Sequence, residues 1–264
     1  MVPDSIIIVN ALALFILIAL FLAAFFLLRR KVSIQVIPLL VGIAFFIIFS
    51  LVLEQGLHSI VLQPNAQGQI TLMNTHPLFY ILYGIFAAGI FEELARFIAF
   101  KLLKQGYANF GTSLAYGLGH GGIEMLIIGG GSLLGNLVIS ILLRNPNGQL
   151  AQELSPSIIQ ALQNTSAGEI FYVVIERFPV LLVQICLSVL VWVAVNKTKQ
   201  LWLFPLSITI HALIDLPGAM VQVGFLSNYV VLYGSLYLMT AGLIFFTMRI
   251  LKNNELYPLK KGLP

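Results

Sequence analysis

Long apolar stretches alternate with short polar joints along the whole chain. Each stretch is about 20 residues or longer, the length that an α-helix needs to cross the hydrocarbon core of a bilayer. The pattern predicts an all-α protein, a polytopic bundle of about seven transmembrane helices, at residues 5–28, 33–53, 77–101, 110–143, 170–195, 201–222 and 227–250. The composition does not shift along the chain and we see no internal repeat, so we expect residues 1–264 to form a single multipass domain.

The composition agrees with this prediction. Apolar residues make up 59% of the chain, charged residues only 9%, and the mean hydropathy is +0.98. A water-soluble domain of this length does not need so much apolar surface, so we expect lipid contact on most helices and a location in the cell membrane. The net charge of +4 does not indicate nucleic acid as a partner, because no basic stripe with interleaved aromatic residues is present.

The basic residues gather at alternate joints and predict the orientation of the bundle. In the joints on the opposite side of the membrane, Arg144 is the single Lys or Arg residue. By the positive-inside rule, the N-terminus is expected outside and the C-terminus in the cytoplasm. The first span has no basic segment before its apolar run, so we do not expect a cleavable signal peptide. The residues expected on the cytoplasmic side are Arg29, Arg30, Lys31, Lys101, Lys104, Lys197, Lys199, Arg249, Lys252, Lys260 and Lys261.

Three further features refine the predicted topology. The external segment 145–169 contains a short amphipathic stretch at 157–162, which fits either a surface helix or a lid. The fourth span would reach about 50 Å as a straight helix, and Gly129–Gly131 predicts a kink or break within it. Cys186 is the single cysteine, which excludes an intrachain disulfide and a cysteine-based metal site.

Ionisable residues recur inside three of the predicted spans. They form the groups Glu92-Glu93-Leu94-Ala95-Arg96, His120-Gly121-Gly122-Ile123-Glu124 and His211-Ala212-Leu213-Ile214-Asp215. A charge in the middle of a bilayer costs at least a few kcal/mol, so such residues indicate function. Histidine, glutamate and arginine together supply the base, the oxyanion partner and the organising charge of a hydrolytic site.

These groups are expected at one depth. Counted from the cytoplasmic ends of their spans at the helical rise, Glu93, His120 and His211 lie about 12 Å, 14 Å and 15 Å deep. Glu124 and Asp215 each follow their histidine by four residues and therefore share its helix face. We therefore predict that these side chains meet at one cavity, which opens toward the cytoplasmic side.

Each group also has a purely structural interpretation. Glu92 and Glu93 could simply pair with Arg96, His120 could be a satisfied core histidine, and His211 with Asp215 could be an isolated hydrogen-bonded pair. Outside these groups, Glu176 and Arg177 are interpreted as a structural ion pair, and His58 and His76 as incidental residues at loop edges. The glycines of 117–122 resemble a phosphate loop but follow no strand, so we interpret them as contacts for close helix packing.

Together the motifs resemble the YhfC family, within the superfamily of CAAX-processing and bacteriocin-processing intramembrane proteases. The first motif is Glu92-Glu93 with Arg96, the second Tyr116 with His120, and the third His211 with Asp215. The resemblance covers roughly residues 80–220, the expected catalytic core, and Glu124 also fits the YhfC pattern.

The chain departs from the pattern at three places. Arg96 follows the second glutamate by three residues rather than four, and Asp215 replaces asparagine. Gln184 stands where the family pattern has a histidine, which counts against a catalytic role for the fifth span.

The resemblance implies an intramembrane endopeptidase. It would hydrolyse a peptide bond of a membrane-associated protein or peptide by a glutamate-activated water, without a cofactor. Glu92 or Glu93 would be the base and His120 would hold the water. His211, oriented by Asp215, would stabilise the oxyanion.

Arg96 would fix the second carboxylate of the pair. Three alternatives stay open: a zinc protease in which His120, His211 and a carboxylate hold the metal, a non-catalytic membrane scaffold, and a proton-coupled transporter. The lack of repeated halves counts against the transporter.

The predicted orientation can be tested by labelling. In a chain with Cys186 replaced by serine, a cysteine within 145–169 should react with an impermeant thiol reagent in intact cells, whereas a cysteine at Lys199 should react only after lysis. Labelling of the Lys199 position in intact cells would contradict the orientation.

Overall fold

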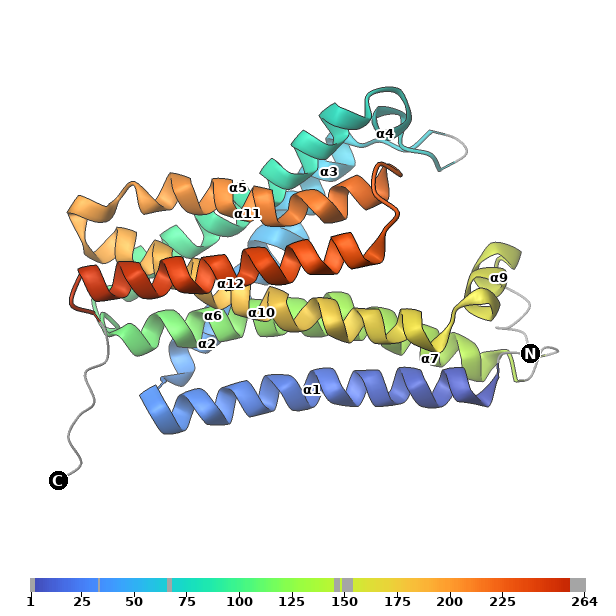
Figure 1. Cartoon of the computed structure of the whole chain (residues 1–264), viewed down its shortest axis with the longest axis horizontal. Coiled ribbons are helices and arrows are strands. Elements are labelled where there is room, and N and C mark those ends of the chain that lie inside the picture. Colours follow the sequence, from blue (N-terminus) through green and yellow to red (C-terminus); the bar gives the residue numbers. More distant parts are fainter. Residues whose placement is uncertain (1–2, 33, 66–67, 145–147, 149–153, 257–264) are drawn as a thin grey trace.

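The computed structural model describes residues 3–32, 34–65, 68–144, 148 and 154–256. Within them every extended regular element is a helix, and seven helices are long and apolar enough to cross a membrane (Figure 1). The predicted all-α polytopic bundle is thereby confirmed. Lys260, Lys261 and most of the segment 145–153 lie outside the described residues.

The seven long helices follow the predicted spans closely. Three of them are joined from two or three consecutive helical segments. Two short helices, α4 (Thr71–Thr75) and α9 (Pro156–Asn164), lie in the longer joints. The long helices are α1 (Asp4–Val32), α2–η1–α3 (Val36–Phe46, Ile47–Glu54, Gln55–Val61), α5 (Pro77–Leu103), α6–η2–α7 (Phe110–Glu124, Met125–Gly130, Gly131–Leu142), α10 (Ala167–Asn196), η3–α11 (Thr198–Gln200, Leu203–Gln222) and α12 (Tyr229–Asn253).

The second long helix differs most from its prediction. It continues past the expected end at residue 53 to Val61. The sequence suggested an end because Glu54, Gln55 and His58 are polar, but these side chains line a cavity inside the bundle. A polar helix face is compatible with a membrane span when it faces a cavity instead of lipid.

Two of the long helices contain π-helical segments, η1 and η2. The predicted break at Gly129–Gly131 takes the form of η2, and the chain stays helical through α7. A π-helical turn widens the hydrogen-bonding pattern without ending the helix, and such turns are frequent at functional sites.

Helix α10 lies in the middle of the bundle, where it contacts α1, α5, α6, α11 and α12. Glycines bring α6 unusually close to its neighbours. A Cβ atom on Gly119 would lie 2.0 Å from the carbonyl oxygen of Leu39, and one on Gly121 would lie 2.6 Å from Cβ of Gln184. These contacts agree with the interpretation of the glycine run as a surface for close helix packing.

The two ends of the bundle differ in charge. Arg29, Arg30, Lys31, Lys101 and Lys252 occupy the last turns of α1, α5 and α12, and we call this the basic end. It is at the left of Figure 1, while the N-terminus, α4 and α9 lie at the opposite end. Large apolar side chains such as Phe15 and Leu238 are exposed between the ends, as lipid contact requires.

The glycine contacts predict a large effect of one methyl group. Gly119→Ala should lower the melting temperature in detergent, because overpacking usually costs about 1–3 kcal/mol. Gly135→Ala is the matched control, because nothing lies within 4 Å of its added Cβ. Equal melting temperatures for the two variants would show that α6 can move away from Leu39 at no cost.

Candidate active site

Three charged residues of α5 form the base of a buried polar network. Glu93 and Arg96 are both 0% exposed. Nη1 of Arg96 donates to Oε1 of Glu93 at 2.6 Å, and Nη2 donates to Oε2 of Glu92 at 3.3 Å. Because neighbouring residues on a helix point about 100° apart, the two glutamates share Arg96 but face different neighbouring helices.

Each glutamate contacts a histidine from another helix. Nε2 of His120, on α6, lies 2.9 Å from Oε2 of Glu92. Nδ1 of His211, on α11, lies 2.8 Å from Oε1 of Glu93, and its Nε2 lies 3.9 Å from Oε2 of Glu92. Nε2 of His211 is also 3.5 Å from Oδ2 of Asp215, one turn further along α11. Three separate helices thus meet around the two carboxylates.

The fifth span also enters the site, in contrast to the expectation from sequence. Gln184, on α10, donates from Nε2 to Oε2 of Glu92 at 3.1 Å and to Oε2 of Glu124 at 2.5 Å, and its Oε1 accepts from Arg96. One turn later, Ser188 accepts from Nε of Arg96 at 3.3 Å. The sequence did contain a sign of this contribution, namely a glutamine and a serine isolated in an apolar run. Such residues in a membrane span usually have a polar partner on another helix.

Glu124 links this network to a second one. Its Oε1 lies 3.4 Å from Nη1 of Arg177, and Arg177 also pairs with its neighbour Glu176. The expected ion pair of Glu176 and Arg177 is therefore present, and it extends to Glu124. The structure thus brings the seven ionisable residues of the three groups into one connected cluster, while their chemical roles stay predictions.

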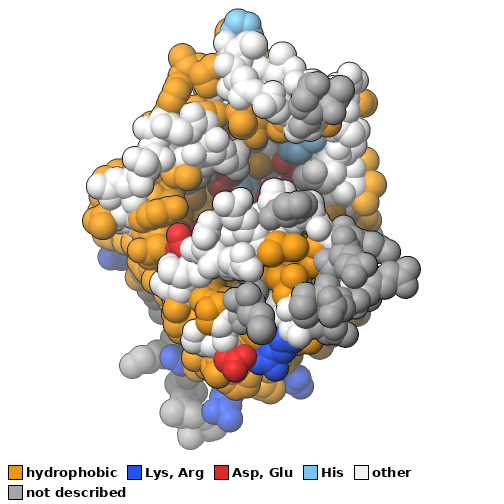
Figure 2. Space-filling view, turned by 90° about the vertical axis from the view of Figure 1, so that its right-hand side faces the viewer, with side chains coloured by type: hydrophobic (Ala, Val, Ile, Leu, Met, Phe, Trp, Pro, Cys, Tyr) orange, Lys and Arg blue, Asp and Glu red, His pale blue; other side chains and the backbone are white. Residues whose placement is uncertain are grey.

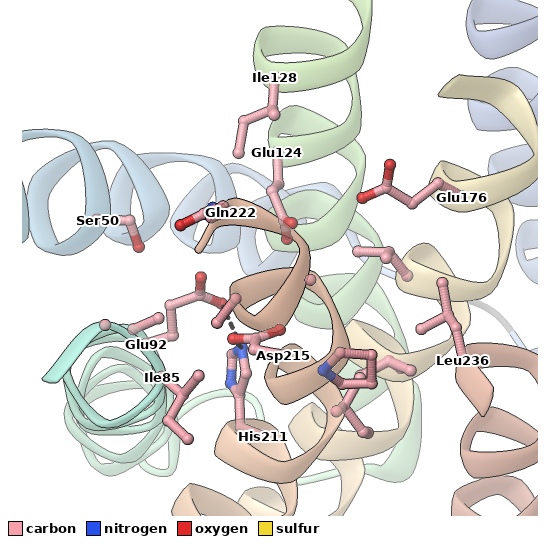
Figure 3. A pocket seen from close by; sticks show the side chains of 18 of the residues that line it. Ser50, Ile85, Glu92, Glu124, Ile128, Glu176, His211, Asp215, Gln222 and Leu236 are labelled. Atoms are coloured by element: carbon pink, nitrogen blue, oxygen red, sulfur yellow. Dashed lines mark ion pairs between the residues drawn. The ribbon is translucent and has the colours of Figure 1, made fainter. Parts of the chain in front are cut away.

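A cavity of about 670 Å³ reaches this cluster. Glu92, Glu124, His211 and Asp215 line it, as the close-up in Figure 3 shows. Glu93, Arg96 and His120 are completely buried behind these residues. The cavity therefore presents some of the ionisable residues and hides the others.

The cavity opens at the end opposite the basic end. Leu62, Tyr80, Gln222 and Tyr229, at helix ends on that side, line its mouth. Figure 2 shows this face, with acidic and histidine side chains at the bottom of a hollow. The prediction of an opening toward the basic end, which the positive-inside rule assigns to the cytoplasm, was wrong. The close glycine contacts of α6 with α2 and α10 leave little space there.

Sequence reasoning missed part of the cavity wall. Glu54 is only 7% exposed and lines the cavity from η1. Nε2 of His58 lies 3.3 Å from Oε1 of Glu54, and its Nδ1 lies 2.8 Å from the hydroxyl of Tyr83. His58 is therefore not incidental. The i,i+4 spacing of Glu54 and His58 was the available signal. His76 lies at the start of α5 with its ring 6.1 Å from that of Phe79.

Three residues of the cluster are arranged so that they could hold a metal ion. Glu92, His120 and Glu124 each offer a ligand atom, all within 4.8 Å of one another and all on buried residues. Nitrogen and carboxylate oxygen donors suit zinc and related divalent ions. Two buried carboxylates at one point also favour a cation between them. His211 stands beside this set, with Nε2 3.9 Å from Glu92.

Comparison with known proteins gives two matches. Residues 14–236 match the family model described as YhfC intramembrane metalloprotease. The chain is also 33% identical over 207 residues to the uncharacterized membrane protein YhfC of Bacillus subtilis (strain 168), across 76% of this chain and 79% of that protein. No solved structure matches the chain. These matches and the seven apolar helices identify a multi-pass membrane protein.

The metal site predicts a measurable metal content. Protein purified without chelator should carry about one divalent ion per chain, and His120→Ala and Glu124→Gln should each remove most of it. His58→Ala is the matched control, because His58 lies in the same cavity but outside the three-residue cluster. Elemental analysis by mass spectrometry measures the ratio, and equal metal contents in all variants would contradict this site.

Proposed function

Because the chain belongs to the YhfC family, described as intramembrane metalloproteases, we propose that it is an endopeptidase of membrane-associated proteins or peptides. Hydrolysis would take place at the inner end of the cavity, within the membrane-spanning bundle. The observation that carries the proposal is Glu92, a buried carboxylate that faces the cavity while His120 and His211 approach it from two other helices.

Glu92 is the better candidate for the general base. It lines the cavity, whereas Glu93 is fully buried and its Oε1 is engaged by both Arg96 and His211. The contacts of Glu92 described above all go to Oε2, so Oε1 is the oxygen offered to a water in the cavity. Glu92 would take a proton from the attacking water and return it to the leaving amine.

Glu93 and Arg96 would act through other residues. The contact of Glu93 with Nδ1 of His211 fixes the imidazole ring so that Nε2 is directed toward Glu92 and Asp215. A protonated His211 would donate from Nε2 to the oxyanion that develops on the scissile carbonyl. Arg96 holds the two glutamates in place by donating one hydrogen bond to each of them.

The metal implied by the family description fits this arrangement. Glu92, His120 and Glu124 would hold it. A divalent cation there would act as a Lewis acid that polarises the scissile carbonyl. Gln184 contacts both Glu92 and Glu124, and would keep the two carboxylates oriented toward each other.

The position of the cavity mouth bears on how a substrate enters. A peptide would reach Glu92 from the end that carries Leu62, Tyr80 and Tyr229, opposite the basic end. With the orientation inferred from the basic residues, this is the non-cytoplasmic side of the membrane. We therefore propose substrates that present their cleavage site at or near the outer leaflet.

Two neighbouring glutamates provide the test of catalysis. The full-length protein in proteoliposomes is incubated with a library of membrane-anchored peptides, and products are identified by mass spectrometry. Glu92→Gln should lower the cleavage rate by about 10²–10⁴-fold, the usual effect of losing a general base. Glu93→Gln should lower it by a smaller factor, about 10–100-fold, because Glu93 acts by orienting His211 and holding Arg96 and not on the attacking water itself.

Removal of His211, the proposed oxyanion donor, is a second and independent test of the peptidase activity. His211→Ala should reduce the rate by about 10²–10³-fold. A scaffold would give another pattern, with no peptide cleaved by the wild-type chain and unchanged partner assembly in all three variants. That pattern would refute the proposed activity.

A further inference from the structure

The charges that line the cavity do not balance. Among the described lining residues, five are carboxylates (Glu54, Glu92, Glu124, Glu176 and Asp215), and the guanidinium group of Arg177 is the single Lys or Arg side chain. A cavity lined mainly by one sign of charge attracts ligands of the opposite sign, more strongly when its walls exclude water. The excess negative charge thus points to a cationic ligand.

Four of the five carboxylates belong to the connected polar network around Arg96 and Arg177. Glu92 pairs with Arg96, Glu124 and Glu176 with Arg177, and Asp215 with His211. Glu54 stands apart on η1. Its one ion-pair partner among the described residues is His58, and no described Lys or Arg lies within 4.0 Å of it. The function proposed above does not use this carboxylate.

A second observation lies one turn away on the same helix. Ser50 is only 5% exposed, yet its hydroxyl has no hydrogen-bond partner among the described residues. Ser50 lines the same cavity as Glu54, and Figure 3 shows it on the helix next to the one that carries Glu92. A buried hydroxyl without a partner is costly unless a ligand completes its hydrogen bonds. Ser50 and Glu54 therefore form one incomplete polar surface.

The surroundings of this surface match a long basic side chain. Leu51, Ile85 and Ala88 line the cavity with apolar groups close in sequence to Glu54 and Glu92. Lysine and arginine bury an apolar stem and present the charge at its tip. A bare metal ion or a peptide amino terminus would use the carboxylate but not this apolar wall.

We propose that Glu54, with Ser50 and His58, forms a subsite for a Lys or Arg side chain of the peptide substrate, next to the bond that is cleaved. The cationic group would pair with Glu54 and donate a hydrogen bond to the hydroxyl of Ser50. His58, held by Tyr83 through Nδ1, fixes the Glu54 carboxylate from the other side. Glu54 lines the same cavity as Glu92, His211 and Asp215. The substrate class is therefore a membrane-associated peptide segment with a basic residue near its cleavage site. This inference rests on the proposed peptidase function.

Binding measurements test the subsite separately from catalysis. Fluorescent apolar peptides that carry Lys, Arg, norleucine or Glu at one position, each with a free or acetylated N-terminus, are titrated with the full-length chain in nanodiscs. The wild-type chain should bind Lys and Arg peptides about 10–100-fold more tightly than the norleucine peptide, and the Glu peptide most weakly. Glu54→Gln should reduce the Lys-to-norleucine ratio to about 1 while leaving the norleucine affinity unchanged.

A matched variant and the wild-type series make the result decisive. Glu176→Gln removes another cavity carboxylate, one that pairs with Arg177, and should keep the preference for Lys and Arg. A wild-type chain without that preference, or a preference that survives in Glu54→Gln, would overturn the subsite. If Glu54→Gln does not fold, the wild-type order of Lys, norleucine and Glu peptides still decides.

The remaining outcomes separate the two proposals. A preference that follows the free N-terminus rather than the Lys position would overturn the assignment to a basic side chain. Peptides that bind with the predicted preference but are never cleaved would refute the peptidase function and leave the subsite standing. Cleavage of Lys and norleucine peptides at equal rates, with equal affinities, would refute the subsite alone.

Discussion

A guanidinium group buried inside a membrane bundle imposes the strictest requirement on this structure. Arg96 is completely buried, so its charge and its N–H groups must be satisfied by protein. Glu92 and Glu93 supply the countercharge, and Gln184 and Ser188 of α10 accept the remaining hydrogen bonds. Since α6 and α11 attach to the same glutamates through their histidines, four helices are positioned relative to one cation. A shift of any of them would leave a buried charge uncompensated.

The same network divides the bundle into a closed and an open half. On the side of the basic end, glycines let α6 contact α2 and α10 almost backbone to backbone. On the other side, the helices leave a cavity that ends at Glu92, Glu124, His211 and Asp215. The polar cluster thus lies where tight packing stops and solvent access begins. This position explains why some of its members face the cavity and others are sealed behind it.

Much of the fold and part of the site were predictable from the sequence. The lengths of the apolar stretches identified the seven helices, since bilayer thickness sets helix length directly. The three motif groups identified side chains that the structure brings together, because depth along a helix follows from counting residues. Counting residues does not show how each helix is rotated about its own axis, and so which of its faces meets a neighbouring helix. For this reason neither the direction of the cavity nor the entry of Gln184 could be predicted.

The cavity wall also depended on information that sequence patterns do not contain. The sequence placed Glu54 and His58 in a polar loop, because polar residues after an apolar run normally mark the end of a span. The exception is a span whose polar residues face a cavity inside the bundle. Their place in the bundle requires knowledge of which face of the second helix meets α5. Gln184 gave the opposite error. Because it replaces the histidine of the family pattern, its helix was not expected to take part in the site, yet its side chain donates to both Glu92 and Glu124.

The π-helical segment η1 has a consequence for how this wall could change over evolution. A π-helical turn accommodates one residue more than an α-helical turn, so residues after it are rotated by about 100° relative to an uninterrupted α-helix. Residues before η1, such as Leu39 and Gly42, contact α6, whereas Glu54 at its end faces the cavity. Gain or loss of a single residue in this segment would therefore turn an entire polar face toward or away from the cavity. Lineages could in this way acquire or discard the charged wall in one step, while the helices around Arg96 keep their positions.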